Sequence, residues 1–127
     1  DGIEELDQGA LEGLTFGEAF TRYPDFFARW KQDPESVREP LGESLGELRE
    51  RVTRALTELA QATGPQTALV VGHQLAWASM LARVRRVEAA KWNRHTLPNA
   101  RFARLWRVED QWVCDPGPEP YDQDGLP

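Results

Sequence analysis

The sequence predicts an α/β fold, and three observations carry this prediction. Residues 45–63 and 75–84 each repeat apolar side chains at helical spacing, and the apolar run at 67–72 between them is short enough for a buried strand. The order helix, strand, helix is typical of sheets with parallel strands. His73 follows the predicted strand directly, at the edge where open α/β sheets bind ligands. A helix N-terminus at that edge offers backbone N–H groups that suit phosphate.

The first part of the chain predicts an extended segment and then a short helix. Residues 1–14 contain acidic side chains and glycines without helical periodicity. Thr15, with Glu18 three residues later, forms a capping-box pattern that predicts a helix running towards Tyr23. We expect Pro24 to interrupt it.

An aromatic cluster of Phe26, Phe27 and Trp30 comes next. We expect these side chains to pack in the core or to cover the site, and direct contact with a substrate is the alternative. Residues 32–42 combine prolines with mixed charges, which predicts a loop.

The central helix has a start and a stop signal in the sequence. Ser44 and Glu47 repeat the capping-box pattern, and Gly64 followed by Pro65 predicts an end near Thr63. One apolar stripe runs between these signals, formed by Leu45, Leu48, Val52, Leu56 and Leu59.

A β-hairpin is expected near the C-terminus. Residues 101–108 and 111–114 predict two strands joined at Glu109 and Asp110, which suit a turn. Residues 87–92 predict a turn or a short helix before this hairpin.

Composition favours one domain, residues 1–114, followed by a tail, residues 115–127. The chain has 127 residues, which is enough to bury roughly two-thirds of its unfolded surface. The tail is rich in proline and acids and lacks Lys and Arg, so we expect it to be disordered. The net charge of −6 and the lack of a basic block argue against a nucleic-acid partner.

The chain contains one cysteine, Cys114, so it has no internal disulfide and no cysteine-rich metal site. This is consistent with a reducing compartment, and we expect a cytoplasmic protein. The sequence shows neither a membrane-spanning stretch nor a signal peptide. We expect no cofactor, no metal ion and no membrane partner.

Four motifs in order resemble those of the histidine phosphatase (phosphoglycerate-mutase-like) superfamily. Residues 3–15 resemble its stretch E-x-x-x-G-x-x-E-G, and Tyr23-Pro24 follows in register. Residues 42–44 match the Gly-Glu-Ser start of a helix that contains Arg51-Val52. Residues 71–73, Val-Gly-His, resemble the second histidine motif of the family.

The resemblance implies the three-layer α/β/α phosphoglycerate-mutase-like fold. The family's nucleophile is the His of an Arg-His-Gly motif near its N-terminus, and these 127 residues contain no such motif. The two histidines are His73 and His95, and the family gives His95 no role. We therefore expect an N-terminally truncated portion of a family domain, carrying half of an active site.

The resemblance also assigns roles to individual residues. His73 corresponds to the second histidine, which holds phosphoryl oxygens. Independently of the resemblance, the N–H of Gln74 at the start of the predicted helix is expected to be a further donor to the substrate. Glu5 corresponds to the general acid, which protonates the leaving alcohol and then activates water. Glu4 and Glu12 compete for this role, although Glu12 is expected to be structural.

Two departures favour a phosphatase over a mutase. The mutases carry a Tyr shortly after the catalytic Glu, where this chain has Gln8. Their long basic insertion is also missing, because the loop between Trp30 and Glu43 is short and has Lys31 and Arg38 as its only basic residues.

The resemblance thus implies a phosphomonoesterase that acts on a small-molecule phosphate ester through a phosphohistidine. This chain would supply the general acid and the second histidine, and alone it should be inactive. The alternative is a non-catalytic phosphatase-like domain used for ligand binding or assembly. Glu43 and Ser44 are expected to cap a helix rather than bind a ligand. We expect a homodimer or an association with the missing N-terminal segment.

Overall fold

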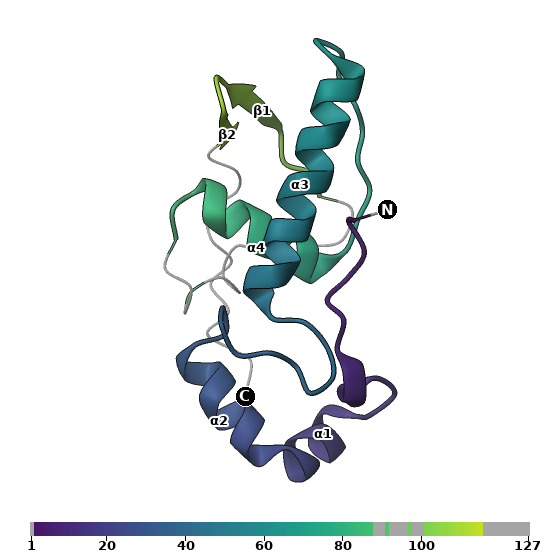
Figure 1. The fold of residues 1–127 in the computed structure, drawn as a ribbon, viewed down its shortest axis with the longest axis vertical. Coiled ribbons are helices and arrows are strands. Elements are labelled where there is room, and N and C mark those ends of the chain that lie inside the picture. Colours follow the sequence, from purple (N-terminus) through teal and green to yellow (C-terminus); the bar gives the residue numbers. More distant parts are fainter. Residues whose placement is uncertain (1, 88–90, 92–96, 98–100, 116–127) are drawn as a thin grey trace.

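A computed structural model describes residues 2–87, 91, 97 and 101–115 of the chain (Figure 1). His95 and residues 116–127 of the predicted tail lie outside the described residues, as does most of the predicted turn at 87–92. The elements in chain order are η1 (Gly9–Leu11), α1 (Phe16–Arg22), α2 (Pro24–Gln32), α3 (Leu45–Thr63), α4 (Gln74–Val84), β1 (Leu105–Val108) and β2 (Gln111–Cys114).

Both predicted capping boxes form at helix N-termini. The Oγ1 of Thr15 accepts a hydrogen bond from the Glu18 N–H at 3.3 Å, and the Glu18 carboxylate accepts one from the Thr15 N–H at 2.8 Å. At α3 the Ser44 Oγ accepts from the Glu47 N–H at 3.2 Å, and Glu47 accepts from the Ser44 N–H at 2.9 Å. These bonds satisfy N–H groups that have no partner within the helix.

Pro24 begins a helix, which the sequence analysis missed. It occupies the first turn of α2, where its fixed φ suits a helix and its lack of an N–H leaves no helical hydrogen bond unmade. The residue therefore ends α1 and starts α2 at the same point. Phe26 on α2 is buried, which confirms core packing for this aromatic side chain, while Phe27 and Trp30 are half-buried.

The predicted strand at residues 67–72 is wrong. This segment is not a strand in the structure, and it makes no backbone hydrogen bond with the described residues. Its side chains still alternate as in a strand: Val70 packs against the core, whereas Leu69 and Val71 are 87% and 79% exposed. A strand requires a hydrogen-bonding neighbour, and the described residues provide none here.

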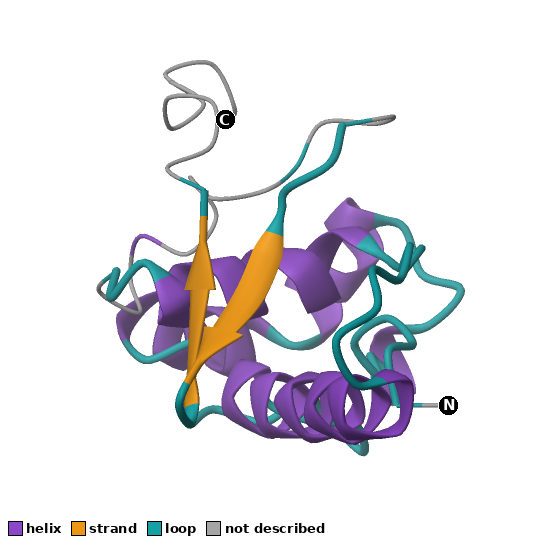
Figure 2. Cartoon of the chain, turned by 90° about the horizontal axis from the view of Figure 1, so that it is seen from above, coloured by secondary structure: helices purple, strands orange, loops and turns teal. Residues whose placement is uncertain are grey.

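The predicted hairpin is confirmed, with a shorter first strand. β1 and β2 pair antiparallel, with Leu105 opposite Cys114 and Val108 opposite Gln111. The hairpin lies over the helices (Figure 2), and the indole N–H of Trp112 donates to the Thr57 hydroxyl of α3 at 3.3 Å.

The main core lies between α3, α4, the N-terminal segment and the hairpin. In Figure 1, α3 runs through the upper half of the molecule, and α1 and α2 lie below it. The buried side chains of this core are Leu6, Leu45, Leu48, Val52, Leu56, Ala76 and Met80. A smaller cluster of Leu11, Ala19 and Phe26 holds α1 and α2, and Trp30 contacts both clusters.

The described residues thus form helices with one two-stranded antiparallel sheet, rather than the complete three-layer α/β/α arrangement that was expected. Among the described residues, the segment at 67–72 has no neighbouring strand, so the expected central parallel sheet does not form there. No helix among the described residues is long and apolar enough to cross a membrane.

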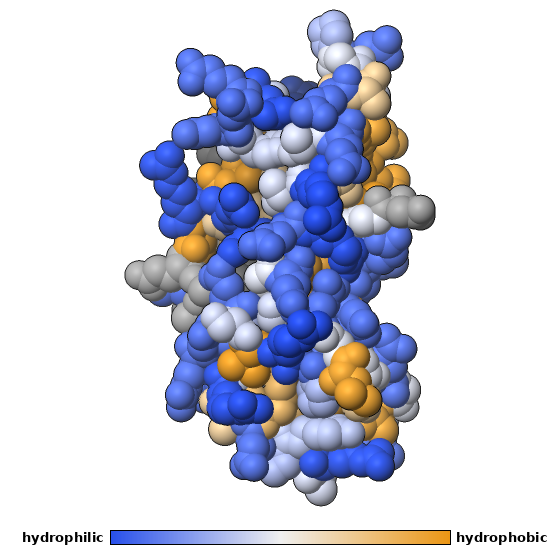
Figure 3. Space-filling view, viewed as in Figure 1, coloured by the Kyte–Doolittle hydropathy of each residue, from blue (hydrophilic) through white to orange (hydrophobic). Residues whose placement is uncertain are grey.

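Apolar side chains are exposed in several places on the face shown in Figure 3, within a mainly hydrophilic surface. Phe16 and Phe20 on α1 are exposed, and their rings stack at 6.1 Å between centroids. Leu69 and Val71, in the segment between α3 and α4, are also exposed.

Candidate functional site

The carboxylate of Glu5 binds the N-terminus of α4. Its Oε2 accepts a hydrogen bond from the Leu75 N–H at 3.0 Å, and its Oε1 accepts one from the Ala76 N–H at 3.1 Å. The Glu5 Oε1 also accepts from the N–H of Leu6 at 2.9 Å. A negative charge at this position is favoured by the helix dipole and replaces the usual side-chain cap. Two segments that are 70 residues apart in the chain therefore meet at one helix end.

His73 is the N-cap residue of α4. Its backbone is extended, with φ −112° and ψ 166°, and its carbonyl accepts the Trp77 N–H at 3.1 Å. The imidazole makes no capping hydrogen bond, and the side chain is exposed. Because Glu5 serves the second and third N–H groups of the helix, the imidazole of His73 is left available for another ligand.

Gln74 is the first residue of α4, and it is also exposed. Within the described ranges no hydrogen bond is found for its backbone N–H. The N-terminus of α4 thus combines a donor at Gln74, an imidazole at His73 and a carboxylate from Glu5.

Gly72 sets the path of the chain just before this site. A Cβ atom at this position would lie 2.9 Å from the Trp77 Nε1 and 3.6 Å from the Ile3 carbonyl oxygen. The first distance is shorter than a normal contact, so a larger residue would push the indole away. Glycine therefore lets the chain pass between α4 and the N-terminal segment, which carries Glu5.

The two competing carboxylates lie in different surroundings. Glu4 is exposed, and its Oε2 accepts from the Gly2 N–H at 2.7 Å. Backbone N–H groups of Glu4 itself and of Gly2 lower the pKa of the Glu4 carboxyl, so this group favours the charged form. Glu12 is exposed and follows η1 in a turn. Of the three carboxylates, only Glu5 contacts the N-terminus of α4.

Arg51 and Glu43 hold the segment that carries Glu5. The Arg51 Nη2 donates to the Glu43 Oε1 at 2.5 Å and to the Glu5 carbonyl at 3.2 Å, and Nη1 donates to the Glu4 carbonyl at 3.3 Å. Nη1 also forms an ion pair with the Glu4 carboxylate at 3.1 Å. The hydrogen bond to Glu43 raises the pKa of Arg51, so the guanidinium stays charged.

Glu43 does not cap a helix, contrary to expectation, whereas Ser44 does. The Glu43 Oε1 accepts the Asp7 N–H at 3.0 Å, and the Glu43 N–H donates to the Asp7 carbonyl at 3.0 Å. Gly42 permits this approach, since a Cβ there would lie 2.1 Å from the Asp7 carbonyl oxygen. In the Gly-Glu-Ser motif, Glu43 therefore binds the N-terminal segment at Asp7, and Ser44 caps the N-terminus of α3.

Glu39 is a buried carboxyl near this docking point. Its side chain is 7% exposed, and no hydrogen-bond partner of its Oε2 is found within the described residues. Burial raises the pKa of Glu39 from 4.5 to about 7, because the charged form loses its hydration.

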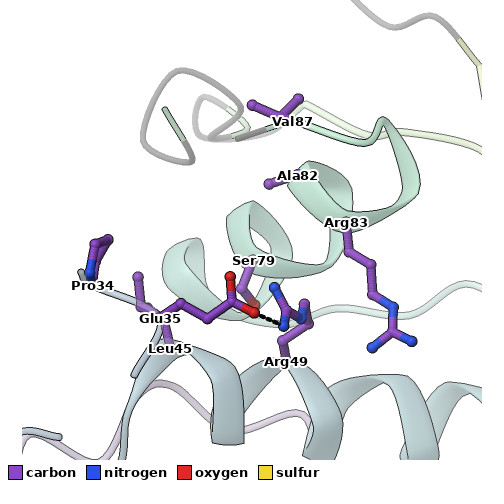
Figure 4. A pocket seen from close by; sticks show the side chains of 8 residues that line it. All are labelled: Pro34, Glu35, Leu45, Arg49, Ser79, Ala82, Arg83 and Val87. Carbon is purple, nitrogen blue, oxygen red and sulfur yellow. Dashed lines mark hydrogen bonds and ion pairs between the residues drawn. The ribbon is translucent and has the colours of Figure 1, made fainter. Parts of the chain in front are cut away.

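A small cavity lies between α3 and α4 (Figure 4), and the residues that line it include Glu35, Arg49 and Ser79. Its volume is about 30 Å³, which is room for one or two water molecules. Arg49 forms an ion pair with Glu35 across its edge (Figure 4). The cavity is too small for a phosphate ester, and Glu5 and His73 do not line it.

Glu5, His73 and Gln74 were predicted as site residues, and all three lie at the N-terminus of α4. The contacts of Arg51 and Glu43 with the segment that carries Glu5 were not predicted. The signal was present, because both residues belong to motifs of the resemblance, but their contacts span 36 to 47 residues and have no local pattern.

Comparison with known proteins agrees with these motifs. The sequence profile of the histidine phosphatase superfamily (branch 1) matches residues 1–116. Phosphoserine phosphatase 1 of Hydrogenobacter thermophilus is 31% identical over 109 residues, which cover 86% of this chain and 52% of that protein. A bifunctional protein of Mycobacterium tuberculosis is 42% identical over 73 residues, covering 58% of this chain and 20% of that protein.

Solved structures of phosphatases share the fold. The α-ribazole phosphatase of Shigella flexneri matches with a TM-score of 0.72 and 17% identity, over 90% of this chain and 56% of that one. A mycobacterial glucosyl-3-phosphoglycerate phosphatase in complex with inorganic phosphate matches with a TM-score of 0.69 and 21% identity, over 90% and 60%. The chain spans between half and two-thirds of the length of these three phosphatases. With a profile match over nearly its whole length, the chain belongs to the histidine phosphatase superfamily (branch 1).

Proposed function

We propose that this chain supplies the general acid and the second histidine of a phosphomonoesterase that works through a phosphohistidine. The observation that carries the proposal is the pair of hydrogen bonds from the Leu75 and Ala76 N–H groups to Glu5, directly after His73. The substrate is a small-molecule phosphate ester. The relatives named as phosphatases support this class of reaction.

His73 acts on the phosphoryl group in this proposal. Phosphoryl transfer places negative charge on the phosphoryl oxygens, and catalysis depends on stabilising that charge. An exposed imidazole and the Gln74 N–H at the start of α4 are suitable donors to those oxygens. The dipole of α4 adds to the same field.

Glu5 acts on the leaving oxygen. Its carboxyl group lies at the N-terminus of α4, where His73 is the N-cap residue. In its protonated form it would donate a proton to the leaving alkoxide. After the alcohol leaves, the same carboxylate would accept a proton from the attacking water.

The nucleophile comes from a segment with an Arg-His-Gly motif, which these 127 residues do not contain. The test compares the 127-residue chain with a polypeptide that joins it to such a segment, read from the codons upstream of Asp1. We expect the joined protein to hydrolyse phosphate esters and to trap phosphate on the His of that motif. The bare chain should do neither. Phosphohistidine formed on the bare chain would overturn the proposal.

A non-catalytic, phosphatase-like binding or assembly domain is the second candidate. It would apply if no segment with an Arg-His-Gly motif is encoded together with these 127 residues. A start codon or a stop codon within about 90 codons upstream, with no Arg-His-Gly between, would support it, given a usual domain size of roughly 100–200 residues. Turnover by the joined protein would exclude it.

A further inference from the structure

We infer that Arg51 is a positioning residue, which aims the Glu5 carboxylate at the N-terminus of α4 through its bonds to the backbone of the Glu5 segment and to Glu43. The inference rests on the proposed function for the catalytic meaning of Glu5. The alignment of Glu5 with α4 is a property of the folded chain, and it can be measured without turnover.

Arg51 contacts the backbone on both sides of the Cα atom that carries the Glu5 side chain. Arg51 donates to the carbonyls of Glu4 and Glu5, at 3.3 and 3.2 Å. These bonds fix the peptide group before Glu5 and the one after it. The backbone direction at Glu5 then determines where its carboxylate lies.

Glu43 fixes the orientation of Arg51 in turn. Its carboxylate accepts from the Arg51 Nη2 at 2.5 Å and from the Nε at 3.3 Å, which is a two-point contact. The same carboxylate accepts the Asp7 N–H at 3.0 Å. The Arg51–Glu43 pair therefore contacts the chain at residues 4, 5 and 7, on both sides of the buried Leu6.

The planar, five-donor guanidinium is necessary for this set of contacts. It reaches two carbonyls and two carboxylates from one side chain, whereas the ammonium of a lysine has three donors around one nitrogen. The Arg51 side chain is 23% exposed, so these contacts are only partly screened by water. Arg54, on the same helix, is exposed and makes no such contact in the described part of the chain, so it provides a matched control.

The experiment follows the backbone amides of Leu75 and Ala76 by NMR in the ¹⁵N-labelled 127-residue chain. In the wild-type chain, both amides should be protected from hydrogen exchange, because both N–H groups donate to the Glu5 carboxylate. In Arg51→Gln we expect exchange at these two amides to accelerate about fivefold relative to the other amides of α4, as for the loss of a helix cap. Arg54→Gln should behave like the wild-type chain.

Two further variants keep the inference falsifiable if Arg51→Gln does not fold. Arg51→Lys preserves the charge, and we expect it to lose the exchange protection of the Leu75 and Ala76 amides, as Arg51→Gln does. Glu43→Gln preserves the shape, and we expect a smaller loss of this protection. A folded Arg51 variant with wild-type exchange at both amides would overturn the inference. Activity data on Glu5 variants would test the proposed function separately, because the amide experiment contains no substrate.

Discussion

At the scale of single residues, the N-terminus of α4 depends on which group serves each backbone donor. Glu5 accepts from the second and third N–H groups, so the N-cap residue His73 is not needed as a cap. Most N-cap positions hold Ser, Thr, Asp or Asn for this purpose. A histidine at the N-cap with a carboxylate supplied from elsewhere is the arrangement expected if the imidazole has another ligand.

The substitution His73→Ala tests whether the imidazole acts on a bound ligand. In the polypeptide that joins this chain to an Arg-His-Gly segment, we expect kcat to fall by about 10²-fold or more, or roughly 2.7 kcal/mol of lost charge stabilisation. The fold should persist, because the exposed imidazole makes no capping bond. Steady-state turnover and thermal unfolding measure the two effects. Wild-type turnover in a folded variant would remove His73 from the site.

Glu39 predicts a pH dependence of stability. Its pKa is raised to about 7 in the folded chain, so the folded state binds more protons than the unfolded state between pH 4.5 and that value. Stability from this group is therefore fully present below pH 4.5 and is lost as the pH rises towards 7.

The substitution Glu39→Gln should remove this loss of folding stability at rising pH. We expect the variant to match the wild-type chain at acid pH and to exceed its free energy of unfolding by up to about 3 kcal/mol at alkaline pH. Urea unfolding at several pH values measures the difference, with the exposed Glu50→Gln as a matched control. A constant difference between Glu39→Gln and the wild-type chain at all pH values would contradict the predicted titration of Glu39.

At the scale of elements, the sequence predicted those that carry their own start signals. The capping boxes at Thr15 and Ser44 located α1 and α3, because the bonds are made within four residues of one another. α2 was missed because Pro24 was interpreted as a breaker, although proline also suits the first turn of a helix.

The segment at 67–72 shows that a local sequence pattern does not reveal whether a strand has a pairing partner. Its apolar run fits a buried strand, but a strand forms only with a partner, and the described residues offer none. The same holds for the candidate site. Glu5 and His73 were predicted as site residues from motifs, whereas the contacts of Arg51 depend on a chain path that brings residues 47 positions apart together.

The two capping boxes should differ in their effect on stability. Ser44→Ala should lower the free energy of unfolding by about 1 kcal/mol, because Ser44 starts the helix that holds most of the main core. Thr15→Ala is the matched control on a seven-residue, mostly exposed helix, and it should cost clearly less. Denaturant melts of both variants provide the comparison. Equal losses would show that α1 is as important to global stability as α3.

At the scale of the whole molecule, the described residues match part of the fold of histidine phosphatases and contain no parallel sheet. Leu69 and Val71 point outward from a segment whose backbone has no partner among the described residues. Unpaired backbone groups beside exposed apolar side chains favour pairing with another strand.

We therefore expect the 127-residue chain to associate, either with another copy or with a segment that supplies the nucleophile. Sedimentation velocity at several concentrations should give more than the mass of one chain. Replacing Leu69 and Val71 with threonine should shift the chain towards the monomer, because threonine suits an extended backbone and removes apolar surface. A compact monomer of the wild-type chain at every concentration would contradict this expectation.

The assignment of Glu5 as the general acid is the central claim, and the dependence of Glu5→Gln on the leaving group tests it most directly. The measurement compares kcat/KM for an alkyl phosphate and for p-nitrophenyl phosphate in the joined polypeptide. An alkoxide needs protonation to leave, so the alkyl phosphate should lose about 10² to 10⁴-fold, whereas the aryl phosphate should lose far less. Equal losses on the two substrates would contradict the account and leave Glu5 as a structural cap of α4.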